Sequence, residues 1–274
     1  MLSTHGSLLS HQKHHPPAPR NFLHRLYDGM TLKSAVKRAD AVVVSSVMEF
    51  EEALEFGIGK HKLHIIPDGI DSHTVDSDRS GRLRKDLCLL FAGPVTRSRR
   101  VELLLRAARK LTLPFRIILA ATPDRLEADE NSSGYLLEMK KLAKTLGMED
   151  HIDILENPSP QELSQCYADA DIFIYPSAYE TSGTTLLQAG TSGLPIISTP
   201  VGLAKEIVVT GENGFIVPAD PDMICDRILQ LGHADIRQKF GQHMREKVLG
   251  EFGWNAVMKR YMDLYDSLKK PYTE

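Results

Sequence analysis

The chain has 274 residues, of which 42% are hydrophobic and 25% charged, a composition that excludes a disordered or fibrous protein. The formal net charge of −3 is too balanced for a protein that coats nucleic acid, so we expect no nucleic acid partner. The three cysteines lie far apart in the sequence. They predict neither a disulfide framework nor a zinc site, and a reducing compartment fits best.

The N-terminal end, residues 1–40, is locally basic. The prolines in residues 14–19 exclude regular structure there, and the apolar spacing of residues 21–38 predicts two short helices. No apolar run approaches the roughly 18 residues of a membrane-spanning helix, and the first residues lack the pattern of a signal peptide. We therefore expect a cytoplasmic protein, with a peripheral contact to anionic lipid at the inner face of the membrane through this basic end.

Short β-branched runs alternate with amphipathic stretches along the rest of the chain. The predicted strands are residues 41–44, 63–66, 87–91, 115–119, 152–155, 171–175, 195–198 and 214–217. Near-continuous apolar strands separated by helices predict an α/β fold, with a Rossmann-like, doubly wound parallel sheet whose ligands bind at the carboxyl ends of the strands. A loss of pattern near residues 76–81 predicts two domains, 1–80 and 81–274, the second ending in a long closing helix.

The most informative stretch, residues 175–195, predicts a strand, a loop, a helix and a second strand. Ser182 can cap the helix, and Gly183 allows close approach of a ligand, so the free amides around Gly183, Thr184 and Thr185 predict an anion site. Glu180 and Gln188 lie on either side of this helix start, and both side chains can bind hydroxyl groups.

This stretch resembles the signature of glycosyltransferase family 4 (glycosyl transferases group 1), the retaining nucleotide-sugar glycosyltransferases of the GT-B fold. The signature has two glutamates separated by seven residues, and Glu180 and Gln188 take these positions. The resemblance implies that Glu180 contacts donor-sugar hydroxyls and that Gln188 contacts the nucleotide ribose. Glutamine keeps the hydrogen-bonding capacity but loses a charge-assisted bond. Residues 168–177, and residues 200–208 followed by 211–217, resemble the segments that flank the signature.

A second family element corresponds to residues 91–102, where the family holds the donor diphosphate with an arginine and a lysine after a glycine. Gly93 matches the glycine, Pro94 takes the arginine position and Arg99 takes the lysine position. Arg99 can neutralise a diphosphate, and Arg97 can reach it from the same loop. His5 matches a histidine that reaches the donor sugar. The resemblance thus implies Glu180 and His5 as catalytic residues, and as donor-binding residues Gly93, Arg97, Arg99, Gly183, Thr184, Thr185 and Gln188.

The resemblance covers nearly all of this chain but only part of the family's architecture: the C-terminal donor domain and part of the N-terminal acceptor domain. It implies a retaining glycosyltransferase that takes a nucleotide-diphosphate sugar as donor and a glycan or lipid-linked hydroxyl as acceptor. Either a partner chain supplies the missing N-terminal half, or the sequence begins at an internal methionine. No metal or other cofactor is expected, because no Asp-x-Asp pair lies in a suitable loop.

Two other functions remain open at this point. A donor-binding subunit without catalysis of its own would also explain Pro94 and Gln188. A nucleotide-sugar epimerase would need further acid and base carboxylates facing the sugar, and the sequence offers no position for them.

Overall fold

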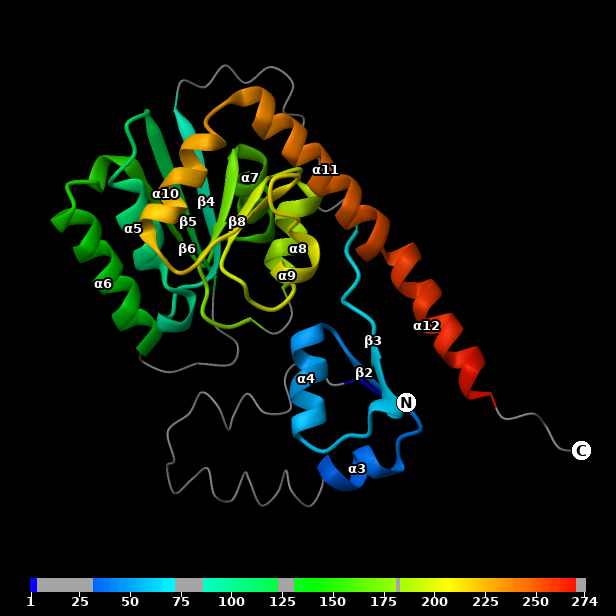
Figure 1. Cartoon of the computed structure of the whole chain (residues 1–274). Coiled ribbons are helices and arrows are strands. Elements are labelled where there is room, and N and C mark those ends of the chain that lie inside the picture. The colour runs from blue at the N-terminus through cyan, green and yellow to red at the C-terminus, as the bar shows by residue number, and fades with distance from the viewer. Residues whose placement is uncertain (4–31, 72–85, 123–130, 181–182, 270–274) are drawn as a thin grey trace, which may run out of the picture. The chain divides into compact units, whose positions relative to one another are not determined.

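The computed structural model describes residues 1–3, 32–71, 86–122, 131–180 and 183–269, with side chains in the 131–145 helix from residue 134 onward. They fall into two compact units (Figure 1). The first unit comprises Met1–Gly69 with Trp254–Glu274, and the second comprises Ile70–Gly253. The predicted boundary at residues 76–81 lies outside the described residues.

The first unit contains a three-stranded parallel sheet in the order β1-β2-β3, formed by Leu2–Ser3, Val42–Val44 and Leu63–Ile65. The buried side chains of β2 alternate between two faces of this sheet, as strand geometry requires. One face packs against α3 (Lys33–Arg38) and α4 (Val47–Glu55), and the other packs against α12 (Trp254–Leu268). A 3₁₀ turn, Lys60–Lys62, leads into β3.

The closing helix α12 differs from its predicted assignment. The sequence interpretation placed it with the donor domain, whereas the structure groups it with the first unit. Val257 and Leu264 of α12 are buried in one cluster with Ala41, Val43 and Ile66. The apolar face of this helix was predicted, but the surface that it covers depends on tertiary packing.

The second unit contains a six-stranded parallel sheet in the order β6-β5-β4-β7-β8-β9. In chain order, its strands are β4 (Leu87–Pro94), β5 (Phe115–Thr122), β6 (Ile152–Glu156), β7 (Ile172–Tyr175), β8 (Ile196–Ser198) and β9 (Gly214–Ile216). The strand order runs outward in one direction from β4 and in the other direction from β7. The predicted doubly wound parallel sheet is therefore confirmed, and its topological switch point lies between β4 and β7.

Helices cover both faces of this sheet (Figure 1). Leu89 and Phe91 of β4 face a core shared with α5 (Val101–Ala108), α6 (Asn131–Thr145) and α10 (Pro221–Gln230). Leu90 and Ala92 face the opposite core, shared with α7 (Pro160–Asp169), α8 (Thr184–Thr191), α9 (Ala204–Ile207) and α11 (Ala234–Phe252). Because both faces are buried, the strands read as continuous apolar runs.

Local signals in the sequence set several helix starts. Ser159 and Glu162 form a reciprocal capping box at the start of α7, with proline in the first turn. Asp220 is the N-cap of α10: its side chain accepts a hydrogen bond from the Asp222 amide, and a proline again follows in the first turn. None of the helices in the described part of the chain is both long and apolar enough to span a bilayer.

Candidate donor-binding site

The site lies where β4 and β7, the two strands at the switch point, each end in a loop. After β4, a 3₁₀ turn formed by Arg97–Arg99 leads into α5. After β7, residues 176–180 lead toward α8, whose N-cap is Gly183. Ligands of open parallel sheets bind at this position because the two loops diverge and leave a crevice between them.

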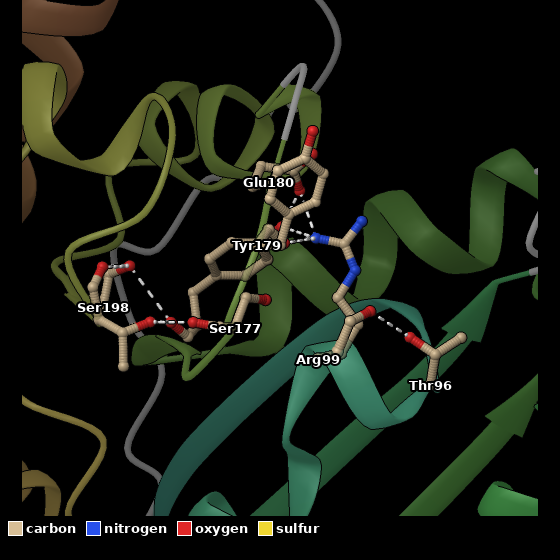
Figure 2. Close-up of polar contacts among 9 residues, drawn as sticks. Thr96, Arg99, Ser177, Tyr179, Glu180 and Ser198 are labelled. Atoms are coloured by element: carbon tan, nitrogen blue, oxygen red, sulfur yellow. Dashed lines mark hydrogen bonds and ion pairs between the residues drawn. The ribbon is translucent and has the colours of Figure 1, made fainter. Parts of the chain in front are cut away.

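Arg99 and Glu180 form a buried ion pair across this point. Arg99 Nη1 lies 2.6 Å from Glu180 Oε2, and the two side chains are 18% and 7% exposed. Figure 2 shows the guanidinium turned toward Glu180 and the backbone of Tyr179, whose carbonyl oxygen accepts a bond from Nη1 at 3.2 Å. A pair this well shielded from water is screened little by salt. Removal of either side chain would leave the charge of the other without compensation.

Tyr175, the last residue of β7, joins this pair. Its hydroxyl donates a hydrogen bond to Glu180 Oε2 and accepts one from Arg99 Nη1 at 2.5 Å. The guanidinium carbon also lies 5.8 Å from the centre of the Tyr175 ring. Sequence reasoning had not singled out Tyr175, and its only signal was its position as the last strand residue before the motif.

Backbone contacts hold the loop that carries Glu180. The amide of Ala178 donates to the carbonyl of Ser98 at 2.7 Å, which ties the β7 loop to the β4 loop. Gly202 has a φ of +41°, and a Cβ there would lie 2.7 Å from the Glu180 carbonyl oxygen. Only glycine fits this contact without a shift of the backbone. Gly202 lies in the loop after β8, so this loop packs against the backbone of Glu180 and restricts its position.

Ser177 of this loop and Ser198 and Thr199 at the end of β8 carry three buried hydroxyls; Figure 2 labels Ser177 and Ser198. Thr199 Oγ1 donates to the Ser177 carbonyl oxygen at 2.5 Å, and Ser198 Oγ contacts the Tyr175 carbonyl oxygen at 3.2 Å. The Ser177 hydroxyl is buried and has no hydrogen-bond partner within the described structure. An unsatisfied hydroxyl costs stability and marks a loop that is not optimised for folding alone.

The start of α8 offers backbone donors next to the ion pair in sequence. Gly183 adopts a left-handed conformation with φ +67°, and a Cβ there would lie 2.7 Å from Leu203 Cβ. The first amides of any helix lack intrahelical acceptors and carry the positive end of the helix dipole. Thr184 and Thr185 stand at this position, whereas the predicted cap Ser182 lies outside the described residues.

Gln188 lies one turn further along α8. Its side-chain oxygen accepts a hydrogen bond from the hydroxyl of Tyr167 at 3.1 Å. Tyr167 belongs to α7 and is fully buried, and burial raises the pKa of its hydroxyl far above the ordinary value, so it stays a donor. Tyr167 is a second residue that the sequence analysis missed, because no local pattern links α7 to α8.

Arg97 is not brought to the Glu180 cluster. Its guanidinium pairs with Glu138 of α6 at 2.7 Å and lies over the ring of Tyr135 at 5.4 Å. Its side chain is 75% exposed. Arg97 is therefore directed at α6, whereas Arg99 in the same turn is directed at the loop after β7. The diphosphate contact assigned to Arg97 stays a prediction.

Gly93 lies near the end of β4 with a φ of +148°, a backbone conformation that residues with a Cβ rarely adopt. It lies on a strand at the switch point, and its assignment as a donor-binding residue stays a prediction. His5, the second predicted catalytic residue, lies outside the described residues. Within them, no group of three or more His, Cys, Asp or Glu side chains is placed to hold a metal ion.

The doubly wound sheet, with an arginine and a helix start at its switch point, defines the Rossmann-like α/β class whose sites accept anionic ligands. Residues 74–247 match the model of the family described as glycosyl transferases group 1. The chain belongs to this family, as the resemblance implied.

Curated relatives agree with this assignment. The chain is 27% identical over 255 residues to a D-inositol 3-phosphate glycosyltransferase from Corynebacterium urealyticum, in a match covering 85% of this chain and 58% of that protein. It is 25% identical over 251 residues to an MMP alpha-(1->4)-mannosyltransferase from Mycolicibacterium hassiacum, with 88% and 58% covered. The chain thus spans less than two thirds of the length of these relatives.

Solved structures share the fold. Sucrose-phosphate synthase from Thermosynechococcus elongatus superposes with a TM-score of 0.78 at 23% identity, covering 97% of this chain and 67% of that one. Anabaena Alr3699/HepE, solved in complex with UDP, gives a TM-score of 0.81 at 18% identity, with 97% and 71% covered. The fold is therefore that of the GT-B glycosyltransferases.

Proposed function

We propose that this chain carries the donor site of a retaining glycosyltransferase that moves a sugar from a nucleotide-diphosphate donor to an acceptor hydroxyl. The observation that carries the proposal is the buried pair of Arg99 and Glu180 at the switch point of a sheet of this family. A cation and a hydroxyl-binding carboxylate side by side match the two parts of such a donor, its diphosphate and its sugar.

Each residue has a role in this proposal. Arg99 and the first amides of α8, at Gly183, Thr184 and Thr185, stabilise the charge of the departing diphosphate. Glu180 orients the sugar through its hydroxyls, and Gln188 binds the ribose. His5 reaches the donor sugar, and Gly93 allows close approach of the phosphates.

In the reaction, the bond between the sugar C1 and the diphosphate oxygen breaks, and a bond from the acceptor oxygen to C1 forms on the same face. The acceptor proton passes to the departing phosphate oxygen, so the anomeric configuration is retained. Arg99 and backbone amides supply the positive charge in this scheme, which uses no resident metal or cofactor.

Nucleotide binding provides the test. Calorimetric titration of the chain with UDP, GDP and their sugars should give saturable binding that Glu180→Ala and Arg99→Ala both weaken. Arg106→Ala removes an exposed arginine of α5 and serves as the matched control. Absence of binding by a demonstrably folded chain would overturn the proposal.

A donor-binding subunit that needs another chain for transfer is the second candidate. Gln188 favours it, because its hydrogen bond to Tyr167 is neutral where the family signature has a carboxylate. Product analysis separates the two, since the first candidate yields a glycoside from a supplied glycan or lipid-linked acceptor, and the second only binds donor. A partner chain bearing the acceptor half would then restore transfer.

We also propose a cytoplasmic location with peripheral attachment to the inner membrane face through the basic residues 1–40. Flotation with anionic liposomes should show binding at low salt that is lost at high salt. Equal flotation with neutral liposomes, or none at low salt, would contradict this attachment.

A further inference from the structure

We propose that Tyr175 is a positioning residue of the donor site, whose buried hydroxyl holds the Glu180 carboxylate in its working orientation. This inference rests on the proposed function, because the orientation of Glu180 matters only if that residue contacts a donor sugar. Tyr175 itself would touch neither sugar nor phosphate.

The contacts of one hydroxyl carry the inference. Tyr175 is 1% exposed, and its hydroxyl is engaged on both sides, as donor to Glu180 Oε2 and as acceptor from Arg99 Nη1. Glu180 Oε2 thus receives two hydrogen bonds, one from Tyr175 and one from Arg99. These donors come from two separate segments, β7 and the turn after β4, so together they restrict the position of this oxygen more than one donor does.

Tyr175 belongs to a buried strand of the sheet, whereas Glu180 lies in a loop. The Tyr175 backbone is part of β7, and its carbonyl oxygen accepts bonds from the Thr199 amide and the Ser198 hydroxyl, both at 3.2 Å. Its ring stacks against Phe173 with centroids 6.0 Å apart and an angle of 18° between the planes. The hydrogen bond from the Tyr175 hydroxyl therefore anchors the Glu180 side chain to the sheet.

Arg99 keeps other contacts when this hydroxyl is removed. Its Nη1 also bonds the Tyr179 carbonyl oxygen and Glu180, while Nε and Nη2 make no side-chain hydrogen bond to any described residue. Those two nitrogens can bind a phosphate oxygen in either case. Loss of the hydroxyl should therefore affect the sugar step much more than the affinity for the diphosphate.

The test compares Tyr175→Phe with Tyr135→Phe. Tyr135 is also buried and also donates its hydroxyl to a carboxylate, that of Glu102, but it lies on α6, where its ring contacts the Arg97 guanidinium and not Glu180. Both variants keep the ring and lose one buried hydroxyl. We measure melting temperature, the Kd for UDP or GDP, and the slow hydrolysis of the nucleotide sugar that the wild-type chain binds.

Tyr175→Phe should lower the hydrolysis rate constant about tenfold or more, while Kd for the nucleoside diphosphate stays within about threefold. Tyr135→Phe should change neither. Equal hydrolysis by the two variants would overturn the inference and leave the proposed function intact. A parallel fall in melting temperature, nucleotide affinity and hydrolysis in Tyr175→Phe would also overturn it, by showing a purely structural role. No nucleotide binding by the folded wild type would overturn the proposed function and this inference together.

Discussion

The two ends of the donor motif are held in similar ways but with different strength. Glu180 meets the hydroxyl of Tyr175 from β7, and Gln188 meets the hydroxyl of Tyr167 from α7. Glu180 also has a cation, Arg99, at 2.6 Å, whereas the Gln188 bond is neutral on both sides. Charge-assisted hydrogen bonds are roughly twice as strong as neutral ones. Glu180 is therefore held by a charged partner, whereas the contact that holds Gln188 is neutral.

The largest expected effect comes from breaking the charged end. Arg99→Ala leaves the Glu180 carboxylate buried without its cation, which should destabilise the second unit by about 3 kcal/mol. Chemical denaturation followed by circular dichroism measures this loss. The double variant Arg99→Ala/Glu180→Gln should recover part of it, and a double variant no more stable than Arg99→Ala would contradict the pairing.

A smaller effect should follow from adding charge at the neutral end. Gln188→Glu keeps an acceptor for the Tyr167 hydroxyl and, under the proposed function, presents a carboxylate to the ribose, so the affinity for UDP or GDP should rise about fivefold. Calorimetry measures the change. In the Tyr167→Phe background the same substitution should gain less, because the new carboxylate loses its buried donor.

Glu49 in the first unit is a buried carboxylate for which the described residues supply no cation. It is 2% exposed, its Oε2 accepts bonds from the amide and hydroxyl of Ser45, and its Oε1 has no partner within the described structure. Burial raises the pKa of Glu49 above its ordinary value of 4.5, an effect that the Ser45 bonds partly offset. The folded form therefore binds the proton more tightly than the unfolded form does.

The contribution of Glu49 to the free energy of unfolding should be largest below about pH 4.5, the ordinary pKa. It should be lost as the pH rises through the elevated folded-state pKa. Glu49→Gln should remove that fall, so its melting temperature should exceed that of the wild type at pH 8 and match it at pH 4. Scanning calorimetry across this range checks the sign. If the melting temperature of the wild type rose relative to that of Glu49→Gln as the pH increased, the raised pKa would be contradicted.

The smallest effect is expected from Arg97, two residues from Arg99. Its pair with Glu138 is exposed, and exposed pairs contribute at most about 1 kcal/mol. Because the Arg97 guanidinium is directed at Glu138 of α6 and not at the Glu180 cluster, Arg97→Ala should change nucleotide affinity by less than about twofold. A loss as large as that of Arg99→Ala, measured in the same titration, would show that Arg97 turns from α6 to the diphosphate on binding.

Much of the site was visible in the sequence because its signals are local. The spacing of Glu180 and Gln188, the glycine before α8 and the cations after β4 all lie within short segments. Their meaning depends on the carboxyl ends of parallel strands meeting at one edge, a rule that holds for any sheet of this type. Tyr175 and Tyr167 were not found, because a tyrosine at a strand end or on a helix is an ordinary core residue until its hydroxyl has a partner.

The sequence by itself determined the alternation of strands and helices, the parallel sheet and the motif loops, since each follows from apolar periodicity or from glycine and capping residues. Tertiary structure alone decided that α12 packs on the first sheet, that Arg99 turns to Glu180 while Arg97 turns to α6, and that two buried hydroxyls hold the two ends of the motif. The reason is physical. Periodicity specifies which face of an element is buried, whereas the direction of a long polar side chain depends on partners that are distant in sequence.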